Sequence, residues 1–353
     1  ALAHWLNEIL GNVGKTVDFT LDPGGDRPTH TAAMRTLCAD MPAGRVETLV
    51  ILGGNPVFDA PADLDFVGNL AKVKNTIHLA LYANETSERC SWVLPRAHTF
   101  EAWDDARAWD GTWSLTQPLI APLWQGKTPA ELVAMLSGTP ASAHELTRET
   151  FRAIHGATGA EKAWRSALHD GVVKDAAWAR QKPVCKATAI AAALEAAAGA
   201  RAGATADSFE VVFTADPKLH DGRFANSGWL QELPEPITKL TWDNAALIAP
   251  ATAARLGVAR SGVNIRIKVD GRELVLPAFI QPGQAASTVV VWLGQGRRRG
   301  GRVAQGVGVD TYPLRGSDAM HIAAGAVVER VGGLHVLATT QDHHAMDTEV
   351  GRK

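Results

Sequence analysis

The feature that most constrains the fold is a short, uninterrupted apolar run that ends in a glycine turn. Residues Glu47 to Leu52 read ETLVIL and are followed at once by Gly53-Gly54-Asn55-Pro56. A continuous apolar strand of this length is typical of a strand that is covered on both faces, as in a parallel sheet. Asn-Pro is a turn signal. The run therefore predicts an α/β fold with a turn at the carboxyl end of a strand, where such sheets bind ligands.

The neighbouring sequence continues this alternation of strand and helix. Helices are expected at 1–10, 31–41, 66–73 and 128–136, and further strands at 76–81 and 91–94. Because strands alternate with helices, we predict a doubly wound, mostly parallel, Rossmann-like α/β domain in residues 1–140. The turn matches neither a GxGxxG fingerprint nor a P-loop, which disfavours a nicotinamide-dependent Rossmann enzyme. A free-standing α/β enzyme that uses a nucleotide stays open as an alternative.

The second half of the chain has a different character. Residues 141–207 are rich in alanine and predict a helical insertion or linker. Short strands then recur at 210–214, 240–242, 265–269, 274–278 and 288–293. Asp270-Gly271 between two of these strands is a two-residue hairpin signal. Residues 208–338 therefore predict a mostly β, barrel-like domain.

Composition excludes several classes of protein. The formal net charge of -2 argues against a nucleic-acid binder, which needs a basic surface. The three cysteines, Cys38, Cys90 and Cys185, form no CxxC or C-x-x-H pattern, so we expect no iron–sulfur cluster and no structural zinc in this chain. No membrane span is expected, because the longest run of small apolar residues is interrupted by Glu195 and Arg201.

Several blocks resemble the last two domains of molybdopterin oxidoreductases. Residues 49–56 are similar to a strand and turn of the third domain of that superfamily, and 85–86, 92–95, Glu101 and 110–112 to its next block. Residues 242–257 and 282–284 resemble its carboxyl-terminal barrel, which caps the pterin dinucleotide in active members. The resemblance implies an α/β sheet domain followed by a barrel of the pterin-dinucleotide type.

Further blocks at 11–17, 118–122, 306–310 and 339–344 resemble one subgroup, the large iron–sulfur subunit of alternative complex III. That complex is a membrane quinol oxidoreductase, and its molybdopterin-like part is known for having lost the molybdenum cofactor. The resemblance thus implies a non-catalytic scaffold without a cofactor of its own. Both ends are expected to be cuts through a longer protein, with residues 339–353 forming a junction to a part that carries the iron–sulfur clusters.

The same resemblance implies partners and a location. The expected partners are the iron–sulfur part of the same subunit, a multiheme cytochrome c subunit, and polytopic quinol-binding membrane subunits. The expected location is the periplasmic face of the cytoplasmic membrane, with attachment through those partners. The alternative is an active molybdopterin-dependent oxidoreductase that binds a pterin dinucleotide between the two domains, with its metal ligand upstream of these residues.

The resemblance also implies a vestigial wall of the pterin site, and no catalytic or metal-ligating residue. The wall candidates are Gly53, Gly54, Asn55, Glu85, Thr86, Asp110, Gly111, Thr112, Pro282 and Gly283. Judged from the residues alone, the glycine turn could present backbone N–H groups to a phosphate. The favoured interpretation is that its glycines let strand and helix pack closely.

The sequence also contains three clusters of polar residues. The first is acidic with interleaved tryptophans, and is interpreted as an interfacial loop with the tryptophans as contact anchors: Glu101, Trp103, Asp104, Asp105, Arg107, Trp109 and Asp110. The second could bind pterin phosphates or an acidic partner, or be a solvated loop: Arg297, Arg298, Arg299 and Arg302. The third, Asp342-His343-His344, lacks spaced metal ligands and is interpreted as part of the junction.

Overall fold

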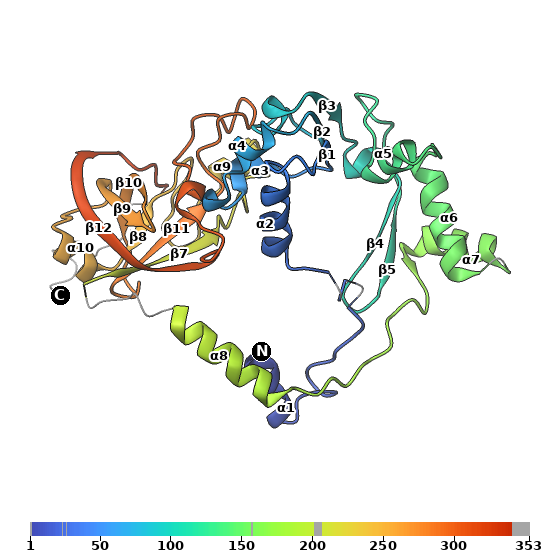
Figure 1. Ribbon diagram of the computed structural model, residues 1–353, viewed down its shortest axis with the longest axis horizontal. Helices are drawn as coiled ribbons and strands as arrows, with labels where there is room; N and C mark the ends of the chain where they lie inside the picture. The colour runs from blue at the N-terminus through green and yellow to red at the C-terminus, as the bar shows by residue number, and fades with distance from the viewer. Residues whose placement is uncertain (1, 23, 26, 157, 201–206, 341–353) are drawn as a thin grey trace, which may run out of the picture.

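The structure, a computed structural model, describes residues 2–22, 24–25, 27–156, 158–200 and 207–340. The chain forms a small parallel sheet, a second small sheet with helices of its own, and a closed barrel, shown in Figure 1. Asp342, His343 and His344 lie outside the described residues. Of the helices described, none has the length and apolar character that crossing a bilayer requires. The domain boundaries at 140, 207 and 338 stay predictions.

The parallel sheet is built from the first part of the chain. Its strands are β1 (Thr48–Ile51), β2 (Asn75–Ala80) and β3 (Trp92–Pro95), paired in the order β1-β2-β3. The helices around it are α2 (His30–Asp40), α3 (Pro56–Asp59) and α4 (Phe66–Leu70), with short 3-10 turns at Ala62–Leu64, Ser87–Arg89 and Thr99–Glu101. One apolar core joins α2 and α4 to the sheet, with Cys38, Met41, Phe66, Leu70 and Val73 buried.

The sheet is parallel as predicted, but the doubly wound arrangement is not present in the described residues. A doubly wound sheet reverses its strand order once, and a helix normally crosses between parallel neighbours. Here the order runs from β1 to β3 without reversal. The connection from β2 to β3 is too short for a crossover helix and contains one 3-10 turn. The coarser prediction, an α/β parallel sheet followed by a barrel, is confirmed.

The barrel closes in the order β10-β8-β11-β7-β12-β9. Its elements are β7 (Phe209–Ala215), α9 (Gly228–Glu232), β8 (Ala246–Ile248), α10 (Pro250–Leu256), β9 (Val263–Val269), β10 (Arg272–Ile280), β11 (Thr288–Leu293), a 3-10 turn (Tyr312–Leu314) and β12 (Ile322–Leu334). The turn between β9 and β10 is Asp270-Gly271, with φ of 47° and 73°. Both residues in the left-handed region are what a two-residue hairpin requires, so this prediction is confirmed.

One strand prediction in this region was wrong. Residues 240–242 do not form a strand, because Lys239 and Trp242 have φ of 62° and 53°, which interrupts the extended backbone. Leu240 makes only an isolated bridge to Thr339. The apolar character of the segment comes from burial beside the barrel, where Leu240 packs in a separate small cluster.

The middle of the chain forms a second unit. It contains β4 (Asp104–Arg107), β5 (Trp113–Thr116) and β6 (Val172–Val173), with α5 (Pro129–Leu136), α6 (Ala143–His155) and α7 (Ala160–Asp170). Its core is aromatic, since Phe151 lies 5.5 Å from Trp113 and 5.2 Å from Trp164 between ring centroids. Of the described residues after 140, α6 and α7 share a core with the β4–β5 hairpin, and the prediction of a helical insertion or linker at 141–207 stays a prediction.

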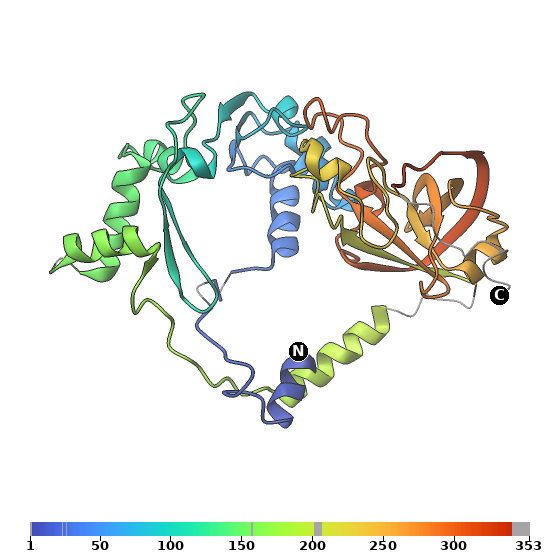
Figure 2. The same cartoon turned by 180° about the vertical axis from the view of Figure 1, so that it is seen from behind.

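Two helices stand apart from both sheets. They are α1 (Leu2–Ile9) and α8 (Ala187–Ala200), and they lie together in both views of the ribbon (Figures 1 and 2). The segment after α1 returns toward the β4–β5 hairpin, where Thr20 Oγ1 donates a hydrogen bond of 2.6 Å to the carbonyl of Trp109. In both ribbon views the barrel and the second unit lie at opposite ends of the molecule, with α1 and α8 between them along one side (Figures 1 and 2).

Candidate functional site

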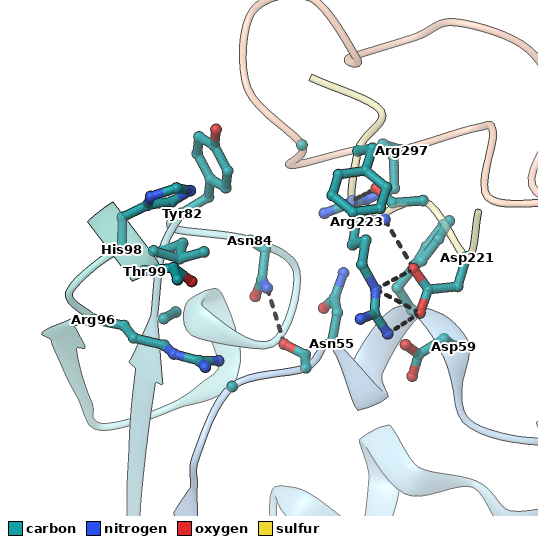
Figure 3. Close-up of a pocket in the computed structure, with 18 of the residues that line it drawn as sticks. Asn55, Asp59, Tyr82, Asn84, Arg96, His98, Thr99, Asp221, Arg223 and Arg297 are labelled. Carbon is teal, nitrogen blue, oxygen red and sulfur yellow. Dashed lines mark hydrogen bonds and ion pairs between the residues drawn. The ribbon is translucent and has the colours of Figure 1, made fainter. Parts of the chain in front are cut away.

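A cavity lies where the carboxyl end of the parallel sheet meets the barrel loops. Its volume is about 420 Å³, within the range of small-molecule sites. Gly53 and Gly54 follow β1, Tyr82 follows β2, and Arg96 follows β3, so all three strand ends contribute to the lining. The barrel side contributes residues 221–224, Arg297 and Gly300. Figure 3 shows the two sides facing each other.

A buried ion pair joins the two sides behind this cavity. Arg297 Nη2 donates to Glu85 Oε2 at 2.8 Å and Nε donates to Oε1 at 3.1 Å, and both side chains are 8% exposed. The backbone N–H groups of Arg298 and Arg299 also donate to Glu85 Oε1, at 2.8 and 2.9 Å. Such a carboxylate is held by donors from residues far away in sequence and has little capacity left for a ligand.

The amide of Asn55 extends this network into the glycine turn. Its Nδ2 donates to Glu85 Oε2 at 2.8 Å, while its Oδ1 accepts from the hydroxyl and the backbone N–H of Thr86. Asn84 accepts from the N–H groups of Thr86 and Ser87 and donates to the carbonyl of Gly54 at 3.2 Å. The wall candidates Asn55, Glu85 and Thr86 therefore belong to one hydrogen-bonded network, which reaches the barrel side through Glu85.

These contacts set the ionisation of the buried carboxyl groups. Burial alone would raise the pKa of Glu85, but the hydrogen bonds from Arg297, the Arg299 backbone and Asn55 outweigh it and hold the pKa at about 2. Burial likewise opposes ionisation of Asp221, and the bonds from Arg223 hold its pKa at about 2. Both groups are therefore carboxylates at neutral pH.

Asp59 behaves in the opposite way. Its carboxyl group accepts no hydrogen bond from the described residues and lines the cavity beside Asp221 (Figure 3). Burial, and then the negative charge of Asp221, raise the pKa of Asp59 to about 7, although Arg315, Arg297 and Arg223 partly offset them. Asp59 therefore titrates near neutral pH at the contact between α3 and the barrel loops.

On the other side of the cavity lies an unpaired cation. The half-buried Arg96 makes no side-chain hydrogen bond or ion pair within the described part of the chain, and Figure 3 shows it across the cavity from Asp59. Gly53 and Gly54 have φ of 95° and 78°, and a Cβ at Gly53 would lie 2.6 Å from Arg96 Nη1. Because Gly53 has no side chain, the Arg96 guanidinium can lie close to the backbone of the turn. The favoured interpretation, in which the glycines only let strand and helix pack closely, does not include this contact.

The other wall candidates lie elsewhere. Asp110, Gly111 and Thr112 form the turn of the β4–β5 hairpin, and none of them lines the cavity. The carbonyl of Asp110 accepts a hydrogen bond of 2.9 Å from the backbone N–H of Trp178, and a Cβ at Gly111 would lie 2.3 Å from that backbone nitrogen. Pro282 and Gly283 occupy the turn between β10 and β11, also outside the cavity.

Within the acidic cluster and the arginine cluster, individual residues differ in burial and in contacts. Trp103 stacks on Trp164 with 6.0 Å between centroids, so it is a packing residue, whereas Trp109 is 79% exposed. The interpretation of the arginine cluster as a solvated loop was wrong for Arg297, which is 7% exposed and ion-paired. Arg299 forms an exposed ion pair with Glu88.

Sequence reasoning missed Asp59 and Arg96. Arg96 lies two residues after the third predicted strand, 91–94, so its position near the carboxyl end of a strand was a usable signal. Asp59 gave no such signal, because it lies at the end of a four-residue helix whose contact with the barrel depends on the tertiary fold.

The chemistry of the lining suits an anionic organic group. Gly53, Gly54 and Arg96 would hold a phosphate-bearing end of a pterin dinucleotide. Glu85, Asn55 and Thr86 fit it poorly, because their polar atoms already bond to protein groups. Within the described residues, no group of three or more His, Cys, Asp or Glu side chains is placed to hold a metal ion. The residues of this cavity therefore fit the phosphate-bearing end of that cofactor.

Comparison with known proteins supports the fold. No family model matches the chain, and no curated protein sequence matches it. Among solved structures, acetylene hydratase from Pelobacter acetylenicus, a member of the molybdopterin oxidoreductase family, is similar with a TM-score of 0.55 at 14% sequence identity. The match covers 85% of this chain and 46% of that chain, so this chain spans less than half of the length of its structural neighbour. A likeness at this identity concerns the fold alone.

Proposed function

We propose that this chain is the non-catalytic, molybdopterin-oxidoreductase-like scaffold of the iron–sulfur subunit of a membrane quinol oxidoreductase of the alternative complex III type. In this role it holds the cluster-bearing part of the same subunit against a multiheme cytochrome c subunit and polytopic quinol-binding subunits. It lies at the periplasmic face of the membrane. Electrons pass to a cytochrome c type acceptor through the neighbouring clusters and hemes, and they need not pass through this chain.

The support for this proposal comes from two levels. The sequence blocks named above resemble that subunit, and the fold is similar to that of a molybdopterin oxidoreductase family member. At the level of residues, Arg297 on the barrel side donates hydrogen bonds to the carboxylate of Glu85, a wall candidate on the sheet side, and so leaves that carboxylate little capacity for a ligand. Because a scaffold needs its two domains fixed to each other rather than opened around a ligand, this buried pair is the observation that carries the proposal.

The test is purification of the native assembly that contains this chain, followed by analysis of metals, hemes and subunits. The proposal expects iron and heme together with polytopic membrane subunits, and no molybdenum or pterin. Stoichiometric molybdenum with an oxidised pterin fluorescence spectrum would overturn the absence of cofactor. A chain that copurifies without hemes and membrane subunits would overturn the assignment to a respiratory complex.

A second candidate function is binding of a pterin dinucleotide in an active molybdopterin-dependent oxidoreductase. The observation that favours it is the cavity at the sheet edge, with the glycine turn and the unpaired Arg96 in its lining. When bound, that group would supply two-electron redox chemistry through its metal. Pterin released by acid from the purified native protein, and lost in an Arg96→Gln variant, would support this candidate against the scaffold.

A further inference from the structure

A second cavity lies between α3, α4 and the loop that follows β11. Its volume is about 310 Å³, at the lower end of the range for small-molecule sites. The sheet side contributes α3 and the start of α4, and the barrel side contributes Arg298, Asp310 and Tyr312. Of the described residues that line it, only Phe58 also lines the cavity at the sheet edge. The two cavities are therefore separate.

The inner wall of this second cavity is apolar and held in place. Phe58 and Phe66 line it and are buried. The ring of Phe58 meets the ring of Tyr312 edge-on, with 4.9 Å between centroids. The hydroxyl of Tyr312 donates a hydrogen bond of 3.0 Å to the carbonyl of Asp221, which fixes that ring. A wall of buried rings of this kind packs against the apolar part of a ligand.

Asp310 supplies the cavity with a carboxyl group that has an open oxygen. Its Oδ1 accepts a hydrogen bond of 3.0 Å from the backbone N–H of Tyr312, and its Oδ2 accepts none from the described residues. The backbone before it is fixed, because Val309 bonds to both amide atoms of Asn244, at 2.8 and 2.9 Å. Burial raises the pKa of Asp310 to about 6, although the bond from Tyr312 and the charge of Arg298 oppose this. A carboxylate that has lost solvation in this way gains from a cationic partner.

Two arginines line the same cavity from its exposed side. Arg89 and Arg298 are exposed, and neither side chain forms a hydrogen bond or ion pair with the described residues. Glu85 also lines the cavity, but its carboxylate is already bonded to Arg297 and to the backbone N–H of Arg298. Guanidinium groups bind carboxylates through two parallel hydrogen bonds. The exposed side of the cavity is therefore suited to the carboxylate of a ligand.

These three features together select a zwitterion with an apolar body. A purely anionic ligand would leave Asp310 without a cation, and a purely cationic ligand would face the two arginines. Arg298 acts electrostatically on Asp310, so the two groups are close enough to serve both ends of one small molecule. We propose that the second cavity binds an α-amino acid with an apolar side chain, with its ammonium group on Asp310 and its carboxylate on Arg298. The site goes beyond the proposed function and does not depend on whether the cavity at the sheet edge binds a cofactor.

The test is isothermal titration calorimetry of the purified full-length protein that contains this chain, with L-leucine and L-phenylalanine as probes. We expect saturable binding, and a higher unfolding temperature in the presence of the amino acid, because a ligand of the folded state stabilises it by mass action. Two analogues of leucine, 4-methylpentanoate without the ammonium group and 3-methylbutylamine without the carboxylate, should each bind roughly tenfold more weakly. No saturable binding of either amino acid up to about 10 mM would overturn the proposal. Equal binding of leucine and both analogues would also overturn it.

Two variants assign the two ends of the ligand. Asp310→Asn keeps an acceptor for the Tyr312 N–H, and should raise the dissociation constant of leucine roughly tenfold while leaving that of 4-methylpentanoate unchanged. Arg298→Gln should weaken leucine to a similar extent and leave 3-methylbutylamine unchanged, and the retained analogue shows in each case that the variant is folded. The control is Arg299→Gln, whose guanidinium pairs with Glu88 and does not line the cavity, and which should change none of these constants. Leucine binding that both variants leave unchanged would mean that the amino acid binds elsewhere, and would overturn the proposal.

Discussion

Arg297 forms a buried, two-point ion pair with Glu85 across the boundary between the parallel sheet and the barrel. The guanidinium also donates to the carbonyl of Gly222 at 2.6 Å and lies 4.9 Å from the ring centroid of Phe58. It therefore contacts the sheet side and two barrel loops at once. Paired and hydrogen-bonded charges are the form in which ions are tolerated in a protein interior, so this residue should decide whether the two domains stay together.

The first prediction concerns Arg297→Gln. It leaves the Glu85 carboxylate buried without its main partner, so the free energy of unfolding should fall by about 3–5 kcal/mol. The measurement is urea unfolding followed by tryptophan fluorescence. The matched control is Arg299→Gln, which removes only the exposed pair with Glu88 and keeps the backbone donor to Glu85, and should cost less than about 1 kcal/mol. Equal losses for the two variants would contradict the assigned role of Arg297.

The second prediction concerns the pH dependence of stability through Asp59. Its pKa is about 7 in the folded protein against 3.8 as the ordinary value. Between these values the unfolded chain releases the proton while the folded protein retains it, so stability falls as pH rises through this window. Asp59→Asn removes that loss and should stabilise the protein by on the order of 2 kcal/mol near pH 8, and hardly at all near pH 4.

The measurement is a series of urea unfolding curves across this range. Glu85 gives the opposite sign, since its pKa of about 2 lies below the ordinary value of 4.5. Its contribution to stability is present above about pH 4.5 and is lost as pH falls toward about 2. Glu85→Gln should therefore cost most near neutral pH. A stabilisation by Asp59→Asn that does not change with pH would mean that the Asp59 carboxyl does not titrate at the domain contact.

Most strands of the parallel sheet and the barrel could be predicted because they are short apolar runs between turn signals. The runs that predicted β1, β9 and β11 differ from the observed strands by at most two residues at either end. The hairpin of β4 and β5 was missed because β4 reads DDAR, a sequence with little strand propensity. The long strand β12 was missed because its glycines interrupt the apolar alternation.

The candidate site was predictable only in part, for a related reason. The glycine turn and the Glu85-Thr86 pair lie close together because they follow neighbouring parallel strands, which the alternation of elements implies. The partner of Glu85 lies 212 residues further along the chain, and no local pattern encodes such a contact. Asp110-Gly111-Thr112 was grouped with the site through the family resemblance, yet it forms a hairpin turn that packs on Trp178.

That packing leads to a third prediction, for Gly111→Ala. Gly111 has φ of 86°, and a Cβ there would lie 2.3 Å from the backbone nitrogen of Trp178 and 2.6 Å from atoms of its indole ring. Backbone strain and the clash should together cost about 3 kcal/mol of unfolding free energy. The control is Gly138→Ala, with φ of 76° and no atom within 4 Å of the added Cβ, which should cost only about 1 kcal/mol. Differential scanning calorimetry compares the two, and equal costs would show that Trp178 yields without penalty.

The fourth prediction tests whether the cavity retains an anion site. Arg96 is half-buried beside Gly53, and its side chain has no hydrogen-bond or ion-pair partner in the described part of the chain, so its charge is available to an oxyanion. Inorganic pyrophosphate, followed by isothermal titration calorimetry, should bind to the wild type and weaken with added salt. Arg96→Gln should raise the dissociation constant roughly tenfold, the scale of one charge-assisted bond. Arg45→Gln, which alters an exposed guanidinium paired with Asp40, should leave it unchanged. Equal binding by the wild type and Arg96→Gln would mean that pyrophosphate binds elsewhere and that Arg96 does not form an anion site in this cavity.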